Sequence, residues 1–372
     1  MHLVEITGYG SRGEGVARLE GGKAVFIPGA ARGDVLEVWL NEDNGRSARA
    51  EIVRIVTPSP YRVEPDCPVY QHCGGCDFRH ITYEEELWAK LRRINDAISR
   101  IGGLPLQIDE ILTTGRINGY RNKAIFHNDG TSLGFYAPKS HNLVPIEHCL
   151  LLKDELNAAL KDLLLSKIPD LPVSEVTLRS GRNGINPPLE EEMDGLIFGV
   201  SGFFQINTGA ALLLFQKARK YAAMSKDEVL IDLYCGVGAL TLFVGRDAGR
   251  AIGVESNPTA VEAARENALR NGLKHIEFYA ADAATWASAT ANPDCVIVDP
   301  PRKGLLPGVK RNILKMSPKR IVYISCDPAT LARDLREFDG YAVKSACAVD
   351  MFPRTANVEC CCLLERSEEC FT

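Results

Sequence analysis

The fold of this chain is decided by the stretch Val229-Leu230-Ile231-Asp232-Leu233-Tyr234-Cys235-Gly236-Val237-Gly238. Its first half predicts a buried strand. The glycines that follow allow the backbone to approach a ligand closely and predict the opening of a helix. The spacing is G-x-G and lacks the third glycine of the dinucleotide fingerprint, which argues against a nicotinamide dinucleotide as the ligand.

Further strands follow this one, with helical stretches between them. Strands are expected at 251–254, 276–279, 295–298 and 321–325, and the clearest helices at 258–271 and 329–338. Such alternation predicts a mostly parallel sheet covered by helices. Ligands of these sheets bind at the carboxyl ends of the strands, so we expect a pocket at that edge.

Acidic residues at the strand ends complete a candidate nucleotide pocket. Glu255 ends the second strand, where an acid can accept hydrogen bonds from both ribose hydroxyls. Asp282 follows the third strand and is placed to meet an adenine amino group. A glycine loop followed by two acids resembles the S-adenosylmethionine pocket of class I methyltransferases. The fourth strand runs into Asp299-Pro300-Pro301-Arg302, where the prolines predict a rigid platform for a substrate.

The fifth strand ends in a candidate nucleophile, Cys326, at the same edge of the sheet. A following helix start and nearby Lys and Arg residues would favour its thiolate. Addition of a thiolate to position 6 of uracil makes position 5 electron-rich, so that it can attack a methyl sulfonium. A base must then remove the position-5 proton, and Glu359 is the candidate. The structural alternatives are a buried cysteine and a surface acid on an edge strand.

The N-terminal half divides into two further regions. Residues 1–57 show short strands at 3–9, 15–19, 24–27, 35–40 and 48–56, which predict a small barrel resembling an OB fold. Thr57-Pro58-Ser59-Pro60 forms a natural linker. Residues 58–200 form a central domain with a helix over about 81–101 that is expected to pack on the third domain, residues 201–372.

The chain has twelve cysteines, and its N-terminus lacks the pattern of a signal peptide. Disulfides are therefore not expected. Cys67, Cys73 and Cys76, with two glycines between the close pair, and Cys149 further along suit an iron–sulfur cluster or zinc. Ligand type alone does not separate these two.

Composition bounds the class of protein. With 372 residues, 45% hydrophobic and 24% charged, the chain is neither disordered nor collagen-like. A net charge of −5 excludes a globally basic nucleic-acid coat. Two local groups of cations could still hold phosphate: Lys90, Arg92 and Arg93, and Arg302, Lys303, Lys310 and Arg311. No apolar run approaches the length of a membrane span, and we expect a cytoplasmic, monomeric protein.

Several motifs together resemble one enzyme family. The stretch 325–335, Ser-Cys-Asp-Pro-Ala-Thr-Leu-Ala-Arg-Asp-Leu, closely resembles the nucleophile signature of RNA uracil-5 methyltransferases. Residues 299–304 and 203–207 match that family as well, and residues 13–33 look like part of a TRAM domain. The resemblance implies an N-terminal OB-like TRAM barrel, a small central α/β iron–sulfur domain and a C-terminal Rossmann-like class I methyltransferase domain.

The resemblance also implies roles for individual residues. Cys326 would be the nucleophile and Glu359 the base, and Phe203 would pack against the flipped uracil. The residues expected to bind S-adenosylmethionine are Gln205, Tyr234, Gly236, Glu255, Asp282 and Asp299, and those expected to ligate a 4Fe–4S cluster are Cys67, Cys73, Cys76 and Cys149. The chain departs from the family at Arg354 and Asn357, where histidines are frequent, and at Ala239, where a small polar residue is frequent.

The sequence therefore predicts transfer of a methyl group from S-adenosylmethionine to C5 of a uridine in ribosomal or transfer RNA. Two alternatives remain open at this point. One is a cytosine-C5 RNA methyltransferase, which also uses a thiol. The other is a non-catalytic iron–sulfur protein that binds RNA, with the barrel supplying contacts.

Overall fold

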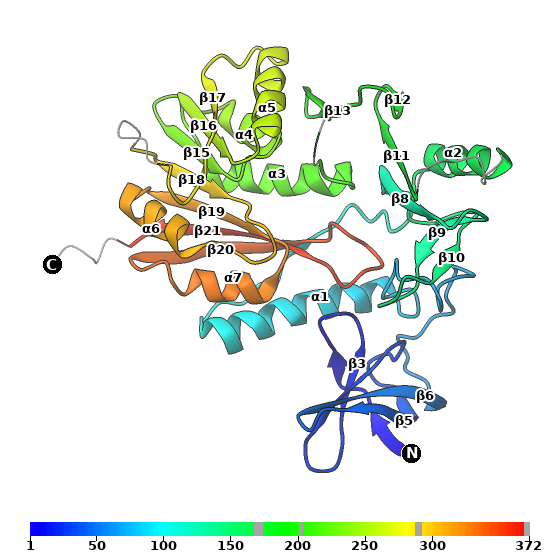
Figure 1. Cartoon of the computed structure of the whole chain (residues 1–372). Coiled ribbons are helices and arrows are strands. Elements are labelled where there is room, and N and C mark those ends of the chain that lie inside the picture. Colours follow the sequence, from blue (N-terminus) through cyan, green and yellow to red (C-terminus); the bar gives the residue numbers. More distant parts are fainter. Residues whose placement is uncertain (167–173, 201, 203, 287–291, 368–372) are drawn as a thin grey trace.

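The computed structural model describes residues 1–166, 174–200, 202, 204–286 and 292–367. Figure 1 shows an N-terminal β-domain, a central region of small sheets and a C-terminal domain with one large sheet. The long helix α1 (Tyr83–Ala97) runs beneath the large sheet toward the central region. Among the described residues, none of the helices combines the length and the apolar character needed to cross a lipid bilayer.

The N-terminal domain is a six-stranded sheet with strand order β1-β5-β6-β4-β3-β2. Its strands are β1 (His2–Glu5), β2 (Gly8–Tyr9), β3 (Gly15–Arg18), β4 (Ala24–Ile27), β5 (Val35–Asp43) and β6 (Ser47–Thr57). The expected single strand at 3–9 is wrong, because the chain changes partners there. The Ile6 N–H donates to Asp34 O (2.9 Å), whereas the Thr7 N–H donates to Val16 O (2.9 Å). The strand therefore splits into β1 and β2.

In its described residues, the central region contains two small sheets and the helices α1, η1 and α2. One sheet has the order β10-β9-β8-β11-β12, and β13 and β14 form a separate hairpin. The elements are η1 (Ile98–Gly102), β8 (Lys123–Asn128), β9 (Leu133–Tyr136), β10 (Leu143–Pro145), α2 (Asp154–Leu165), β11 (Glu175–Gly181), β12 (Gly184–Ile185), β13 (Glu190–Met193) and β14 (Leu196–Gly199). Helix α1 begins where the Thr82 side chain accepts a hydrogen bond from Glu85 N (3.3 Å).

The C-terminal domain is built on a sheet with the order β17-β16-β15-β18-β19-β21-β20-β7. Its strands are β7 (Ile111–Leu112), β15 (Val229–Leu233), β16 (Arg250–Glu255), β17 (Ile276–Ala280), β18 (Cys295–Val298), β19 (Arg320–Ser325), β20 (Tyr341–Val349) and β21 (Glu359–Arg366). Strands β15 to β19 are parallel to one another, and β21 runs antiparallel to β19. The five parallel strands confirm the expected sheet. Strands β15, β16, β18 and β19 are largely buried, whereas the edge strand β17 is partly exposed.

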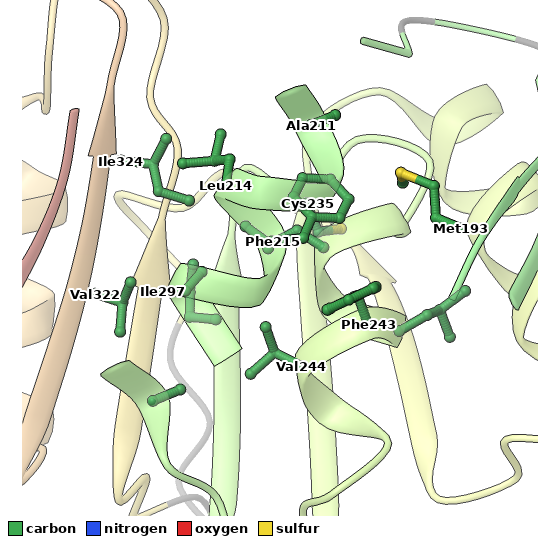
Figure 2. Packing of buried hydrophobic residues seen from close by; sticks show 14 of the residues in the cluster. Met193, Ala211, Leu214, Phe215, Cys235, Phe243, Val244, Ile297, Val322 and Ile324 are labelled. Atoms are coloured by element: carbon green, nitrogen blue, oxygen red, sulfur yellow. The ribbon is translucent and has the colours of Figure 1, made fainter. Parts of the chain in front are cut away.

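Helices cover both faces of this sheet. They are α3 (Thr208–Ala222), α4 (Ala239–Gly245), α5 (Pro258–Arg270), α6 (Pro307–Met316) and α7 (Pro328–Leu335). Figure 2 shows the face under α3, where Leu214 and Phe215 lie near Ile297 and Ile324 of the strands. On the opposite face, Ile94 of α1 and Ile98 of η1 join the same buried cluster as Val298. Helix α1 therefore contributes directly to the core beneath the strand ends.

Candidate active site

Four of the residues predicted to bind S-adenosylmethionine line one cavity at the carboxyl edge of the large sheet: Gln205, Tyr234, Gly236 and Asp299. The cavity encloses about 510 Å³, part of it open to solvent. The other lining residues are Phe204, Phe215, Asp232, Cys235, Val237, Ala239 and Leu240.

The glycine loop has backbone conformations that only glycine adopts without strain. Gly236 and Gly238 have φ values of +53° and +80°. A Cβ at Gly238 would also meet the Phe278 ring at 2.7 Å. Glu255 holds this loop from the next strand, because its Oε2 accepts from the Gly236 N–H (3.2 Å). The loop can therefore bring its backbone close to a ligand.

Glu255 and Asp282 lie beside the cavity and not among its lining residues. Besides Gly236, Glu255 binds Asn257, whose N–H donates to Oε1 (2.9 Å). The Asp282 carboxylate accepts from the Ala284 N–H (2.6 Å). The pKa of the Tyr234 hydroxyl is raised first by burial and then by the charge of Asp282, so these two side chains are near each other.

Asp232 is a functional candidate that sequence reasoning missed, although an acid inside an apolar strand is a visible signal. Its Oδ2 accepts from Thr241 Oγ1 (2.6 Å), whereas its buried Oδ1 has no partner among the described residues. Burial raises the pKa of Asp232 to about 7 against the Thr241 hydrogen bond, and the charges of Asp299 and Glu255 add to the rise. Burial also raises the pKa of Asp299 to about 7. The cavity thus gathers carboxyl groups that a cationic ligand would stabilise in their charged form.

Cys326 follows β19 and is partly exposed at the sheet edge, so it is not the fully buried cysteine of the structural alternative. The expectation of a favoured thiolate is wrong for the protein without ligands. Burial raises the pKa of Cys326 to about 11, and Glu359 and Asp299 add to the rise. Arg302 acts in the opposite direction. Burial is the main cause of the raised pKa of Cys326, and the two carboxylates outweigh the one cation.

Glu359 is the first residue of β21, a strand inside the sheet, and only 6% of it is exposed. Because β21 is antiparallel to β19, it begins at the edge where the parallel strands end. Ser325 pairs with Cys360, which places Cys326 and Glu359 one step further out. Burial, followed by the charge of Asp299, raises the pKa of Glu359 well above its usual value, and Arg302 opposes this. Glu359 is therefore a buried acid whose charge acts on the Cys326 thiol.

A second cavity brings the four predicted metal ligands together. It is lined by Cys67, Cys73, Cys76 and Cys149, with Arg79 and Arg121 among the other lining residues. Arg79 Nε donates to Cys76 Sγ (3.3 Å), and the Gly75 N–H donates to Cys73 Sγ (3.4 Å). Within the described ranges, no group of three or more His, Cys, Asp or Glu side chains is arranged to hold a metal ion.

Two of the cations expected to hold RNA phosphate are buried instead. Lys90 is 1% exposed and contacts Glu86 (2.7 Å) and Asp350 (2.6 Å). Lys310 is 6% exposed and pairs with Asp334 (3.1 Å). Composition alone does not reveal these partners, because Asp350 and Asp334 are distant in sequence from the lysines that they contact. Both lysines are therefore structural.

The segment that carries Gln205 is held by the central region. The Asn122 N–H donates to Ile206 O (2.8 Å), and Asn122 Nδ2 donates to Gln205 O (3.1 Å). Asn122 is fully buried, and its Nδ2 also donates to Glu191 Oε1 (2.9 Å). Phe203, predicted to pack against the flipped uracil, lies outside the described residues.

The glycine loop, the strand-end acids and the eight-stranded sheet define a class I methyltransferase. Three family models match the chain: the TRAM domain over residues 2–53, the methyltransferase small domain over residues 198–321, and tRNA (Uracil-5-)-methyltransferase over residues 287–367. These matches confirm the multi-domain fold that the sequence predicts.

Relatives match this chain over nearly its whole length. An uncharacterized RNA methyltransferase of Clostridium tetani is 30% identical, covering 95% of this chain and 94% of its own length. One from Gloeobacter violaceus is 32% identical, covering 98% of this chain and 96% of its own. The crystal structure of the Pyrococcus abyssi tRNA (uracil-54, C5)-methyltransferase with S-adenosyl-L-homocysteine shares the fold, with a TM-score of 0.78 and 24% identity over 98% of this chain and 100% of that one.

The chain therefore belongs to the RNA methyltransferase family that combines a TRAM domain with a tRNA (uracil-5-)-methyltransferase domain. It is an S-adenosylmethionine-dependent RNA methyltransferase of the uracil-5 type. The resemblance seen in the sequence motifs is confirmed.

Proposed function

We propose that this protein methylates C5 of a uridine in transfer or ribosomal RNA, with Cys326 as the nucleophile and Glu359 as the base. One observation carries the proposal. Cys326 and Glu359 lie at adjoining positions at the ends of the neighbouring strands β19 and β21. The charge of Asp299 raises the pKa of both residues, and Asp299 also lines the cavity that contains the glycine loop. A thiol, a buried acid and a nucleotide cavity at one edge are what C5 methylation through a covalent adduct needs.

The acids of the cavity fit S-adenosylmethionine, which supplies a methyl group on a positively charged sulfur. Asp232 and Asp299 are buried acids with a pKa raised to about 7, and Asp232 Oδ1 has no partner among the described residues. A cationic ligand would satisfy both features. The residues that would hold it are Gln205, Tyr234, Gly236, Glu255, Asp282 and Asp299, together with Asp232.

The proposed reaction begins when Cys326 loses its proton to solvent and its thiolate attacks C6 of uracil. The S–C6 bond forms, and the C5=C6 electron pair moves to give an enolate at O4. The C4=O bond then re-forms as C5 takes the methyl group from the substrate S-adenosylmethionine, whose S–CH3 bond breaks and which leaves as S-adenosylhomocysteine. Glu359 takes the proton from C5, the C5=C6 bond returns, and the S–C6 bond breaks to release the thiolate. Arg302 lowers the pKa of both groups, and therefore favours the charged forms that these steps use.

RNA must present an extruded base to this edge, at a cost of a few kcal/mol. The N-terminal domain, which we propose to be residues 1–57, offers an exposed aromatic side chain for contacts with RNA. Trp39 on β5 is 58% exposed, and aromatic rings of this kind stack on bases. We propose residues 58–200 as the central domain and 201–372 as the catalytic domain.

We expect the purified enzyme to release tritium from transcripts labelled at C5 of uridine and not from transcripts labelled at C5 of cytidine. Methyl transfer to C5 displaces the hydrogen there, so tritium enters water only when that base is the substrate. The measurement is the release of tritium into water when the enzyme and S-adenosylmethionine are mixed with labelled transcripts of transfer and ribosomal RNA. Release from cytidine alone would favour the cytosine-C5 alternative, and release from neither would favour an RNA-binding protein without activity.

We further propose that Cys67, Cys73, Cys76 and Cys149 hold a 4Fe–4S cluster with a structural role. Four thiols that line one cavity are a suitable donor set for such a cluster. Arg79 and Arg121 border the same cavity, where positive charge would balance thiolates. A polynuclear cluster has its own sulfides between the protein ligands, so its ligand sulfurs need not surround a single ion.

Protein purified without oxygen should be brown, with broad visible absorption and iron and acid-labile sulfide in equal amounts. Cys73→Ser should lose most of this absorption because one ligand is gone. Cys347→Ala should keep it, since Cys347 is a fully buried thiol of the large sheet, away from the cysteine cavity. Colourless protein that contains zinc would contradict the assignment.

A further inference from the structure

The loop that precedes the proposed base is held from outside its own domain. Residues 350–358 connect β20 to β21 and extend from the large sheet toward the central region (Figure 1). Most of this loop is buried. Arg354 has a φ of +69°, which a non-glycine residue keeps only when its surroundings enforce it. The contacts that enforce this turn therefore decide where Glu359 lies.

Asp77 supplies the central contacts of this turn. Its N–H donates to Arg354 O (2.8 Å), and its Oδ2 accepts from the Ala356 N–H (2.8 Å). The Phe78 N–H donates to the same Arg354 carbonyl (3.2 Å). Asp77 thus forms hydrogen bonds on both sides of Thr355. The nearer of these contacts, at Ala356, lies three residues before Glu359.

Helix α1 holds the loop from the other side. Lys90 Nζ donates to Asp350 Oδ1 (2.6 Å) and to Phe352 O (3.2 Å). Glu86 Oε1 accepts from the Arg354 N–H (2.7 Å). These groups are buried, so the contacts of the loop are shielded from water and are stronger than the same contacts at the surface.

The N-terminal domain packs against Asp77 and Phe78. A Cβ at Gly13 would lie 2.8 Å from the Cβ of Asp77 and 3.0 Å from the Phe78 ring, and Gly13 has a φ of +77°. Ala356 belongs to one buried cluster with Phe78 and with Ala31 of the N-terminal domain. The N-terminal domain, the cysteine segment and the loop before Glu359 therefore meet at Asp77.

Cys326 is held by contacts at the start of α7, and Arg93 links these to the loop. Its Nη1 donates to Ala356 O (2.8 Å), and its Nη2 lies 3.9 Å from Asp327 Oδ2. The Asp327 N–H donates to Ser325 Oγ (3.2 Å), and Asp327 Oδ1 accepts from the N–H groups of Ala329 (3.0 Å) and Thr330 (2.9 Å). These bonds fix the start of α7, and none of them involves Asp77. Movement of the loop before Glu359 would therefore disturb the base more than the nucleophile.

We propose that Asp77 is a positioning residue for Glu359, acting through the N–H of Ala356 and the carbonyl of Arg354. The proposal rests on the proposed function, in which Glu359 removes the C5 proton. Loss of the Asp77 carboxylate leaves the Ala356 N–H without its acceptor and loosens the turn on the side of Glu359, while the backbone contacts to Arg354 remain. Removal of the C5 proton then slows, while formation of the S–C6 and C5–CH3 bonds continues.

The test uses RNA with uridine and RNA with 5-fluorouridine at the target. With 5-fluorouridine there is no C5 proton to remove, so the methylated adduct of Cys326 persists and its formation reports the steps before the base acts. In Asp77→Ala, formation of this adduct should stay within about twofold of the wild type, whereas turnover on uridine RNA should fall about tenfold. The steady-state fraction of covalent enzyme on uridine RNA should rise accordingly.

Two variants calibrate the result. Turnover on uridine RNA should fall less in Asp77→Asn than in Asp77→Ala, because the asparagine amide oxygen can still accept a hydrogen bond from the Ala356 N–H. Asp339→Asn removes the same charge at an exposed position and should behave as the wild type. Equal losses in both assays, or no loss in either, would overturn the role of Asp77. A wild-type enzyme that forms no adduct with 5-fluorouridine RNA would instead overturn the thiol mechanism itself.

Discussion

Cys326→Ala should abolish formation of 5-methyluridine, with an expected loss of at least about a thousandfold, because the proposed mechanism activates C5 of uracil only through the thiolate adduct. Binding of S-adenosylmethionine should change by less than about twofold, since Cys326 is not among the residues that line its proposed cavity. The measurements are methyl transfer to RNA and calorimetric titration with S-adenosylmethionine. Together they separate loss of the nucleophile from loss of the fold.

The matched control is Cys347→Ala, which removes a buried thiol from β20, a strand separated from β19 by β21. Its effect should be limited to a modest loss of stability, and its turnover should equal that of the wild type. Cys326→Ser should resemble Cys326→Ala, because a hydroxyl is a much poorer nucleophile at neutral pH. Turnover that survives in Cys326→Ala would exclude the covalent adduct.

The parallel half of the catalytic sheet could be predicted closely from sequence. The expected strand at 295–298 coincides with β18, and the one at 251–254 differs from β16 by one residue at each end. These strands are buried on both faces, so their apolar runs are continuous and need no knowledge of the partner. Their order then places Glu255, Asp299 and Cys326 at one edge.

The antiparallel half could not be predicted in the same way. Strand β21 begins with Glu359, an acid that on sequence alone resembles one on an exposed edge strand. Its burial follows from the position of β21 between β19 and β20, which depends on pairings with distant segments. The direction of β21 brings Glu359 to the edge that Cys326 occupies. Sequence motifs identified the residue, and the topology explains its position.

Electrostatics were the least predictable part of the site. The number of basic residues near Cys326 suggested a favoured thiolate, yet its nearest charged groups include Glu359 and Asp299, which raise its pKa to about 11 after burial. Lys90 and Lys310 illustrate the same difficulty, because each is buried against acids and is not free to bind RNA. Charge counts along the chain do not specify which charges meet.

Glu359→Gln should trap the covalent enzyme–RNA adduct, because the S–C6 bond cannot break until the C5 proton is removed. Turnover should fall at least about a hundredfold, the lower range for loss of a general base. Adduct formation itself should not slow. The charge of Glu359 raises the pKa of Cys326, so a neutral glutamine lowers that pKa and increases the thiolate fraction.

The measurement is a denaturing gel, on which the trapped enzyme migrates with its RNA and carries a methyl label from S-adenosylmethionine. Glu365→Gln makes the same change at the far end of β21 and should give normal turnover without an adduct. An inactive Glu359→Gln enzyme that forms no adduct would assign Glu359 to an earlier step, and an active one would place the base elsewhere. Since Cys326 supplies the bond that persists, the double variant with Cys326→Ala must lose the adduct.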